Sequence, residues 1–377
     1  MPVKSKTKDQ HLLHKIALSL IPYAGDVRIR RLITYVGGIE ALFNAKPNTL
    51  LKVPGVGEVI SSQVYQGLNN KEILLRAEKE VEFISKFDIK PCFFLDEDYP
   101  FRLQHCEDAP LIFFTMGETD LNKLKILSIV GTRKPTNEGK KITKELVREL
   151  ASFSKDITIV SGLAYGVDIT AHKAALEQDM ETVAVLAHGL DRIYPAIHRN
   201  TASEIINKGC LLTEFLSEQI PDKPNFVKRN RIIAGLSDAT IVIEAGLRSG
   251  ALITADIANS YNRDVCAIPG RTSDPYSAGP NFLIKSHRAA LVESAADILK
   301  LLNWSISKTE TKPDLFSTFT DDEKSIYTIL LNEGNCPIDL ISRQSGFAPG
   351  KLSSVLLNLE FQGAVECLPG KIFKLCR

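Results

Sequence analysis

The sequence predicts an α/β protein with a doubly wound, mainly parallel sheet, an N-terminal helical region and a C-terminal winged helix. Three observations predict this fold. Short apolar runs alternate with helical stretches between residues 123 and 267, the first 80 or so residues have helical periodicity, and residues 315–377 combine three helical stretches with one hairpin. A chain of 377 residues is long enough for two or three domains. We expect domains at 1–80, 81–304 and 315–377, with a polar linker at 305–314.

Two glycine-bearing turns, at residues 21–25 and 53–57, form a weak repeat in the N-terminal helical region. The second, KVPGVGE, resembles the hairpin of a helix-hairpin-helix motif, in which glycines let backbone amides approach a phosphate. Packing between helices requires such turns as well, so DNA contact and a purely structural role both remain open. After this region, residues 91–95 and 111–115 have the composition of short strands.

The central domain begins near Lys123. Its strands are nearly continuous apolar runs, as is typical of a parallel sheet covered by helices on both faces. We expect them at residues 126–130, 157–160, 182–186, 211–214, 240–243 and 265–267. Sheets of this kind bind ligands beyond the carboxyl ends of their strands, so the segments that follow these runs are the candidate functional segments.

Three of these segments are glycine turns that precede helices, and a helix N-terminus with free amides is suited to an anion. The fourth is the basic run KPNFVKRNR at 223–231, which opens a helix and contains four cations, one aromatic residue and no acid. Arginine and lysine bind phosphates, and an aromatic ring stacks on any base. The alternative for the run alone is an exposed basic helix start. Together the segments predict a polyanion site formed by Gly131, Thr132, Arg133, Ser161, Gly162, Lys223, Phe226, Lys228, Arg229, Asn230, Arg231, Ser249 and Gly250.

Composition and missing motifs exclude several function classes. The formal net charge is +1, so binding to nucleic acid has to be local. The chain has no P-loop, no G-x-G-x-x-G after the first central strand, no H-E-x-x-H and no G-x-S-x-G. Its seven cysteines form no C-x-x-C pair. We therefore expect no cofactor, no metal and no catalytic residue, and His172 near Asp168 is interpreted as a paired helix residue in preference to a catalytic base.

The N-terminal segment lacks the apolar core of a signal peptide, and the chain has no apolar run long enough to span a bilayer. These features predict a cytoplasmic protein that does not contact membranes. The cysteines are then interpreted as reduced thiols.

The motifs GTRKPTNEG, SGLAYGVDITAH, FVKRNRIIAGLS, SGALITADIA and AIPG occur in this order and resemble the DNA-processing protein A family, DprA or Smf. The resemblance implies an extended Rossmann-like domain that binds single-stranded DNA without sequence preference and without catalytic turnover. It also implies loading of the recombinase RecA during natural transformation, a homodimer, and an N-terminal domain of the sterile-alpha-motif or helix-hairpin-helix type. Val227 and Glu138 depart from the residues common in the family at those positions.

The C-terminal region has the pattern of a winged helix. Three helical stretches at 320–332, 338–346 and 348–363 precede a hairpin around Pro369-Gly370, and Thr320 with Glu323 forms a capping box. The third helix carries a single cation, Lys351, which favours contact with a protein over contact with duplex DNA.

An enzymatic alternative remains open, because the central domain is also similar to the lysine-decarboxylase-like phosphoribohydrolases. Those enzymes carry a P-G-G-x-G-T-x-x-E stretch, whereas this chain reads EAGLRSGALITA and has Thr254 in place of the carboxylate. Loss of a catalytic acid or base lowers a rate by about 10² to 10⁴. The sequence therefore favours a binding protein.

Overall fold

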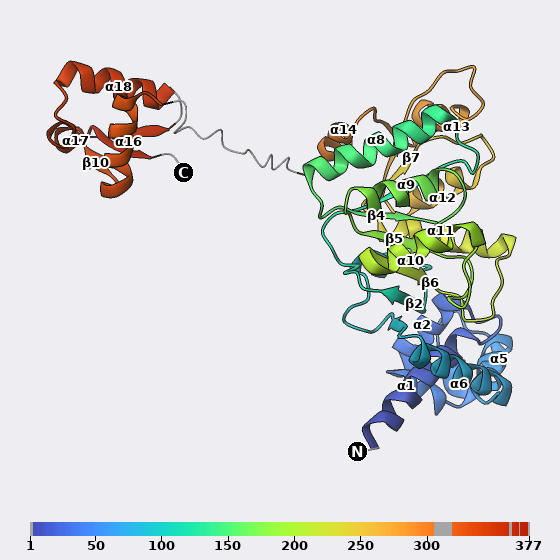
Figure 1. Ribbon diagram of the computed structural model, residues 1–377. Helices are drawn as coiled ribbons and strands as arrows, with labels where there is room; N and C mark the ends of the chain where they lie inside the picture. The colour runs from blue at the N-terminus through green and yellow to red at the C-terminus, as the bar shows by residue number, and fades with distance from the viewer. Residues whose placement is uncertain (1–2, 305–318, 362–363, 369, 376–377) are drawn as a thin grey trace. The chain divides into compact units, whose positions relative to one another are not determined.

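The computed structural model describes residues 3–304, 319–361, 364–368 and 370–375 (Figure 1). The chain divides into two compact units, Met1–Ser305 and Ile306–Arg377. The expected linker at 305–314 and Pro369 of the expected hairpin lie outside the described residues. Within those residues, every helix is too short or too polar to cross a membrane.

The first unit begins with helices that pack on one edge of the sheet. Their apolar side chains share a core with Phe93, Ile112 and Phe114 of the two edge strands. The expected helical N-terminal region is confirmed, and its core is continuous with that of the sheet. The helices are α1 (Val3–Ser19), α2 (Gly25–Val36), α3 (Ile39–Phe43), α4 (Pro47–Leu50), α5 (Glu58–Leu68) and α6 (Lys71–Lys86).

A nine-stranded sheet forms the centre of this unit, in the order β1-β2-β6-β5-β4-β3-β7-β8-β9. The seven strands from β6 to β9 in this order are parallel, and β1 and β2 extend the β6 edge in antiparallel pairing. The strands are β1 (Lys90–Phe93), β2 (Ile112–Gly117), β3 (Ile126–Val130), β4 (Thr158–Ser161), β5 (Thr182–Val185), β6 (Gly209–Thr213), β7 (Ala239–Val242), β8 (Asp264–Ala267) and β9 (Ala290–Leu291). Each expected strand is confirmed to within two residues; β9, with two residues, was not expected.

Helices cover both faces of the sheet, and strand β3 explains why. Ile126 and Val130 pack against α11 and α12, while Leu127 and Ile129 pack against α8, α9 and α14. Successive strand residues point to opposite faces, so an apolar run is needed where both faces are buried. The helices of this part are α7 (Phe101–Gln104), α8 (Asn137–Phe153), α9 (Val167–Glu177), η1 (Ala196–His198), α10 (Arg199–Lys208), α11 (Lys223–Leu236), α12 (Gly250–Ser260), α13 (Ala278–Lys285) and α14 (Ala295–Leu301).

The second unit is a winged helix, as the sequence predicts. Its elements are α16 (Asp321–Glu333), β10 (Cys336–Pro337), α17 (Ile338–Ser345), α18 (Pro349–Phe361), β11 (Val365–Leu368) and β12 (Ile372–Leu375), with the sheet order β10-β12-β11. The capping box between Thr320 and Glu323 is present at the start of α16. The ammonium of Lys351 on α18 lies 2.7 Å from a carboxylate oxygen of Asp322 and 4.3 Å from the centre of the Phe347 ring. The single cation of this helix is therefore already engaged.

Candidate nucleic-acid interface

A cavity of about 360 Å³ opens at the carboxyl ends of the parallel strands. It lies beside β3, whose neighbours are β4 and β7, at the point where the strand order reverses. Ligands of doubly wound sheets bind at such a point. The lining residues come from the end of β3 and the turn after it, from the turn after β4 and the start of α9, from α11, and from the start of α12: Val130, Gly131, Thr132, Arg133, Ala164, Asp168, Phe226, Val227, Arg229, Asn230, Ile233, Ser249, Gly250, Ala251 and Thr254.

The turn after β3 does not present the free amides that the sequence suggested. The Thr132 amide donates to the Glu244 carbonyl oxygen at 2.6 Å. The buried Glu244 carboxylate then accepts from the amide of Thr136 at 2.8 Å and from its hydroxyl at 2.5 Å. Thr136 is the N-cap of α8, so a side chain of the protein already supplies the negative charge at this helix N-terminus. Arg133 and Lys134 of this segment are both exposed, and Arg133 is the one of the two that lines the cavity and can bind a phosphate there.

The N-terminus of α12 differs from that of α8. Its N-cap residue, Ser249, makes no side-chain capping hydrogen bond, and the first turn of the helix contains no acid. The Ser249 hydroxyl is shielded from solvent and has no hydrogen-bond partner among the described residues. Gly250 is exposed, and a methyl group at this position would meet open space. The positive end of the α12 dipole is thus available at the cavity, as an anion site requires.

Arg229 enters the cavity from α11 with only 4% of its surface exposed. Its Nη1 donates to the Val185 carbonyl oxygen at 2.6 Å, and its Nε has no partner within the described ranges. Burial lowers the pKa of Arg229 to about 10, while the nearby Asp168 opposes this shift. The guanidinium is therefore protonated at neutral pH. A buried cation with an unused donor is prepared to bind an anion.

Gly162 acts through its lack of a side chain. A methyl group at this position would lie 1.8 Å from Nη1 of Arg229, so the glycine leaves the space that the guanidinium occupies. Its amide is not free, because it donates to Asp168 Oδ2 at 3.2 Å. Burial raises the pKa of Asp168, and the positive charge of Arg229 counteracts this. The turn after β4 therefore leaves room for the Arg229 guanidinium and positions Asp168 near it.

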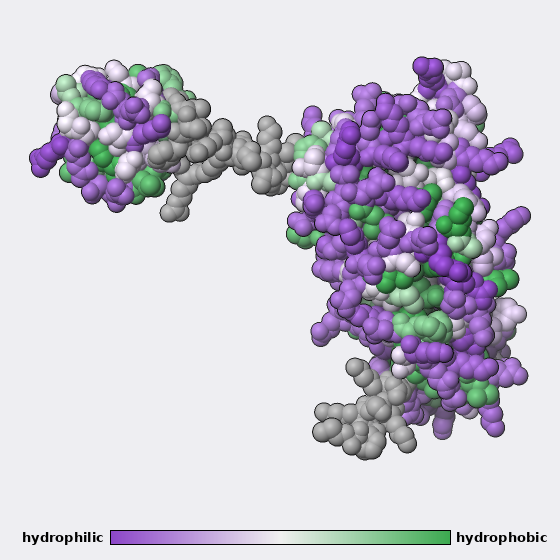
Figure 2. Space-filling view, in the orientation of Figure 1, coloured by the Kyte–Doolittle hydropathy of each residue, from purple (hydrophilic) through white to green (hydrophobic). Residues whose placement is uncertain are grey.

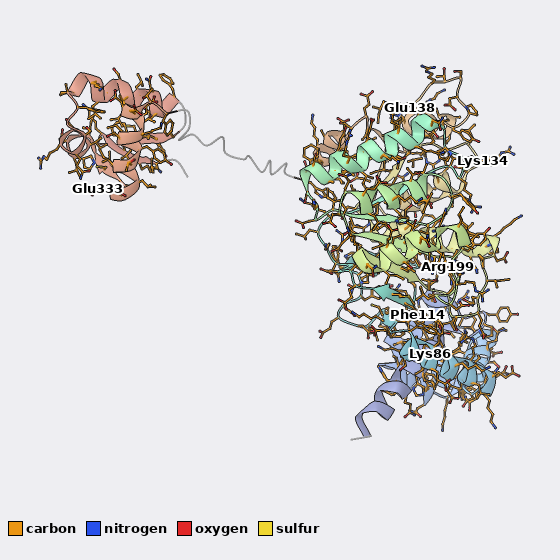
Figure 3. The ribbon with its side chains drawn as sticks, in the orientation of Figure 1. Lys86, Phe114, Lys134, Glu138, Arg199 and Glu333 are labelled. Atoms are coloured by element: carbon orange, nitrogen blue, oxygen red, sulfur yellow. The ribbon has the colours of Figure 1, made fainter. Side chains whose placement is uncertain are left out.

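The guanidinium groups of Arg133 and Arg229 both lie near the Phe226 ring. Its centre is 5.1 Å from the guanidinium carbon of Arg133 and 6.0 Å from that of Arg229. The ring of Tyr194 is 6.0 Å away, tilted by 56°. Residues that follow β3 and β5 thus meet α11 at one edge of the sheet, and Arg133 and Arg229 lie on the same side of the molecule. Figure 3 labels three residues that help to locate these elements: Lys134 and Glu138 near the start of α8, and Arg199 at the start of α10.

Two cations of the basic run point away from this cavity. The Lys228 ammonium lies 2.9 Å from the buried Glu214 carboxylate, which also pairs with Arg231. Arg231 lies 3.3 Å from Asp26 of α2 and is itself buried. The period of a helix explains the division, because residues 226, 229, 230 and 233 share one face of α11, whereas 228 and 231 lie on another.

The four remaining predicted residues differ in position: two line the cavity, one is buried in the sheet and one is exposed at the start of α11. Asn230 lines the cavity, and its Nδ2 donates to the Gly250 carbonyl oxygen at 3.4 Å. Ser161 is buried, and its hydroxyl donates to the Ile129 carbonyl oxygen at 2.6 Å, so it stabilises the sheet. Lys223 is exposed at the first residue of α11 and is not part of the cavity lining. Gly131 packs tightly, since a methyl group there would lie 2.4 Å from Val167.

Several groups that shape the cavity could not be assigned from their sequence. Asp168, Glu244 and Tyr194 contribute through partners far away in the chain. His172 does not act with Asp168: its Nδ1 lies 2.7 Å from the Thr182 hydroxyl, and burial lowers its pKa to about 3. The structural interpretation of His172 is therefore confirmed, with a partner on β5. The spacing of four residues places Asp168 and His172 on one face of α9, so the sequence could not show that they have different partners.

The rest of this face is mainly hydrophilic. In Figure 2, apolar residues gather among the hydrophilic ones over the region in which Figure 1 labels α10, α11 and β6. The described residues contain no group of three or more His, Cys, Asp or Glu side chains suited to a metal ion. The site is thus a cationic cavity with an aromatic ring at its centre.

Comparisons with known proteins agree with this geometry. Residues 90–303 match the family model described as DNA recombination-mediator protein A, and residues 308–371 match the DprA winged helix domain. A putative DNA processing protein DprA of Mycobacterium tuberculosis is 36% identical over 275 residues, which are 72% of this chain and 70% of that protein. Protein Smf of Escherichia coli is 35% identical over 288 residues, which are 74% of this chain and 76% of that protein.

Two solved structures are similar over most of their own length. DNA processing protein A of Streptococcus pneumoniae superposes with a TM-score of 0.65 at 32% identity and covers 78% of this chain and 96% of that one. The corresponding Helicobacter pylori protein has a TM-score of 0.52 at 31% identity and covers 58% of this chain and 97% of that one. The description of the H. pylori structure concerns its binding of single-stranded DNA.

Proposed function

The chain belongs to the DNA recombination-mediator protein A family, and on this premise we propose that it binds single-stranded DNA at the cavity beside β3. One observation carries the proposal: the guanidinium groups of Arg133 and Arg229 lie near the Phe226 ring in a cavity that the uncapped N-terminus of α12 also lines. Cations bind the phosphates of a strand, and an aromatic ring stacks on an unpaired base. A duplex keeps its bases stacked on one another and offers the ring no face.

The finer functional expectations follow from the family and are part of this proposal. The contacts involve phosphates and ring faces, so binding does not depend on base identity. We propose that the protein loads RecA on single-stranded DNA during DNA uptake in natural transformation, and that it acts as a homodimer in the cytoplasm. Lys223, exposed at the start of α11, is proposed as an additional phosphate contact.

We also propose that binding involves no catalytic turnover. The carboxylates in and near the cavity are already engaged, since Asp168 accepts from the Gly162 amide and Glu244 accepts from Thr136, the N-cap of α8. Thr254, in the position that carries the acid of the phosphoribohydrolases, donates its hydroxyl to the Gly250 carbonyl oxygen at 3.1 Å. A cavity of about 360 Å³ has room for a mononucleotide, so the enzymatic alternative is tested directly.

The test compares labelled single and double strands of equal length in a gel-shift titration, with and without a nucleoside triphosphate. We expect a strong preference for the single strand, equal for all base compositions, and no release of phosphate. A parallel incubation with nucleoside monophosphates should release no free base. Equal affinity for duplex and single strand would refute the proposed site, and release of base would favour the enzyme.

A further inference from the structure

The surface next to the cavity carries two exposed tyrosines. Tyr165 follows β4, directly after the cavity residue Ala164, and 47% of its surface is exposed. Tyr194 lies between β5 and η1 and is 46% exposed. Exposed aromatic side chains beside a cationic cavity lose apolar contact with water when an unpaired base stacks on them.

Buried histidines contact the ring of Tyr165 and the backbone of Tyr194. The Tyr165 ring lies edge-on to His198, with ring centres 5.2 Å apart and an angle of 67° between the ring planes. The His198 Nδ1 donates to the Leu163 carbonyl oxygen at 2.8 Å, which fixes the ring beneath Tyr165. The backbone amide of Tyr194 donates to His188 Nε2 at 3.2 Å, and His188 donates its other ring nitrogen to the Gly189 carbonyl oxygen. Each tyrosine ring also packs against a neighbouring ring, His198 for Tyr165 and Phe226 for Tyr194, which reduces the conformational entropy that it loses on binding a ligand.

The two tyrosines continue the path that begins at Phe226. Tyr194 is 6.0 Å from Phe226, and His198, four residues after Tyr194, contacts Tyr165. A base inserted between two rings needs them parallel and separated by about twice the ~3.4 Å spacing of stacked bases. At 6.0 Å and 56°, Phe226 and Tyr194 do not form such a slot. Each ring therefore offers its face to a different base.

A cation stands at the far side of this path. Arg199 begins α10 directly after His198 and is exposed. Arg192, in the same loop, pairs with Asp191, with a nitrogen-oxygen distance of 2.6 Å. Of these two arginines, Arg199 thus remains available to bind a phosphate. That phosphate would link the bases that stack on the two tyrosines.

We propose that Tyr165 and Tyr194 form a second base-stacking surface, which carries the single strand from the cavity past η1 toward Arg199. This inference rests on the proposed function. It specifies that the bound single strand is longer than the part of it that fits in the cavity. The bound strand then lies across the turns after β3, β4 and β5, and its affinity increases with length until the outer ring is occupied.

The test is the dependence of affinity on strand length. Fluorescence anisotropy gives the Kd of oligothymidylates from about 4 to about 16 nucleotides, the range of site sizes of single-strand binding folds. The variant is Tyr165→Ala with Tyr194→Ala. We expect a loss of about 5- to 150-fold per base on the longest strand and no change on the shortest. The matched control is Tyr35→Ala, which removes an exposed tyrosine of α2.

Three further measurements make the result unambiguous. A strand of abasic deoxyribose phosphates should bind wild type and double variant equally. Tyr165→Phe with Tyr194→Phe should retain the long-strand affinity, because stacking requires the ring and not the hydroxyl. Tyr194→Trp in a Trp304→Phe background should lose tryptophan fluorescence when a long strand binds, and this readout tests stacking at residue 194 even if the alanine variant does not fold.

The outcomes separate the two proposals. Wild type that binds no single strand of any length refutes the proposed function. Wild type that binds all lengths, with a double variant of identical long-strand affinity, overturns the second stacking surface alone. An equal loss on short and long strands also overturns it, since the tyrosines would then act through the cavity.

Discussion

Gly162→Ala is expected to weaken DNA binding by displacing Arg229. The added methyl group would lie 1.8 Å from Nη1, 2.5 Å from Cζ and 2.6 Å from Nη2 of that arginine. Carbon atoms in contact prefer ~3.5 to 4.0 Å, so the guanidinium has to move by about 2 Å. The movement breaks the 2.6 Å hydrogen bond to the Val185 carbonyl oxygen and withdraws the charge from the cavity.

Hydrogen bonds of charged groups contribute about 1.5 to 3 kcal/mol, so we expect single-strand affinity to fall by about 10- to 150-fold. A similar loss is expected in the free energy of unfolding, measured by urea denaturation, because a buried carbonyl loses its donor. Affinity is measured by anisotropy under conditions in which the variant is fully folded. Gly246→Ala is the matched control, since a methyl group there meets open space.

A double-mutant cycle with Arg229→Ala isolates the mechanism. With the guanidinium absent, the methyl group at residue 162 meets no cation, so the second substitution should cost little further affinity. The coupling free energy should then nearly equal the loss caused by Gly162→Ala alone. Additive losses, or a Gly162→Ala variant that binds as tightly as wild type, would refute the inference that this glycine serves Arg229.

Five further variants test other parts of the structure. Arg133→Ala should flatten the slope of log K against log salt by about 0.7, whereas Lys228→Ala, whose cation pairs with Glu214, should leave the slope unchanged. Phe226→Ala should cost about 1 to 3 kcal/mol of affinity for a thymidylate strand and nothing for an abasic one. Glu214→Ala should cost about 3 to 5 kcal/mol in urea denaturation, because it removes the buried carboxylate that pairs with Arg231 and Lys228 and leaves Arg231 only its contact with Asp26. His172 has a folded pKa of about 3 against 6.5, so the unfolded chain binds its proton first, and stability should fall by about 1.4 kcal/mol per pH unit below pH 6.5; His172→Gln should remove this slope.

The fold was largely predictable because its signals are local. The apolar run of β3 is continuous, since both of its faces are covered, and the expected range of 126–130 matches Ile126–Val130. The start of α11 at Lys223 was predicted from the basic run, and the capping box at Thr320 was visible as a spacing of three residues. The two-residue strand β9 carries too few residues for any periodic signal.

The candidate site was predictable only in part. The sequence by itself determined that glycine turns and a basic helix follow the strands, and parallel pairing brings those turns to one edge of the sheet. Tertiary structure alone decided what each group does there. Arg229 and Arg231 lie two residues apart on one helix, yet one lines the cavity and the other pairs with Glu214 and with Asp26 of α2. A side chain's role depends on which charges and carbonyls surround it after folding, and those partners are distant along the chain.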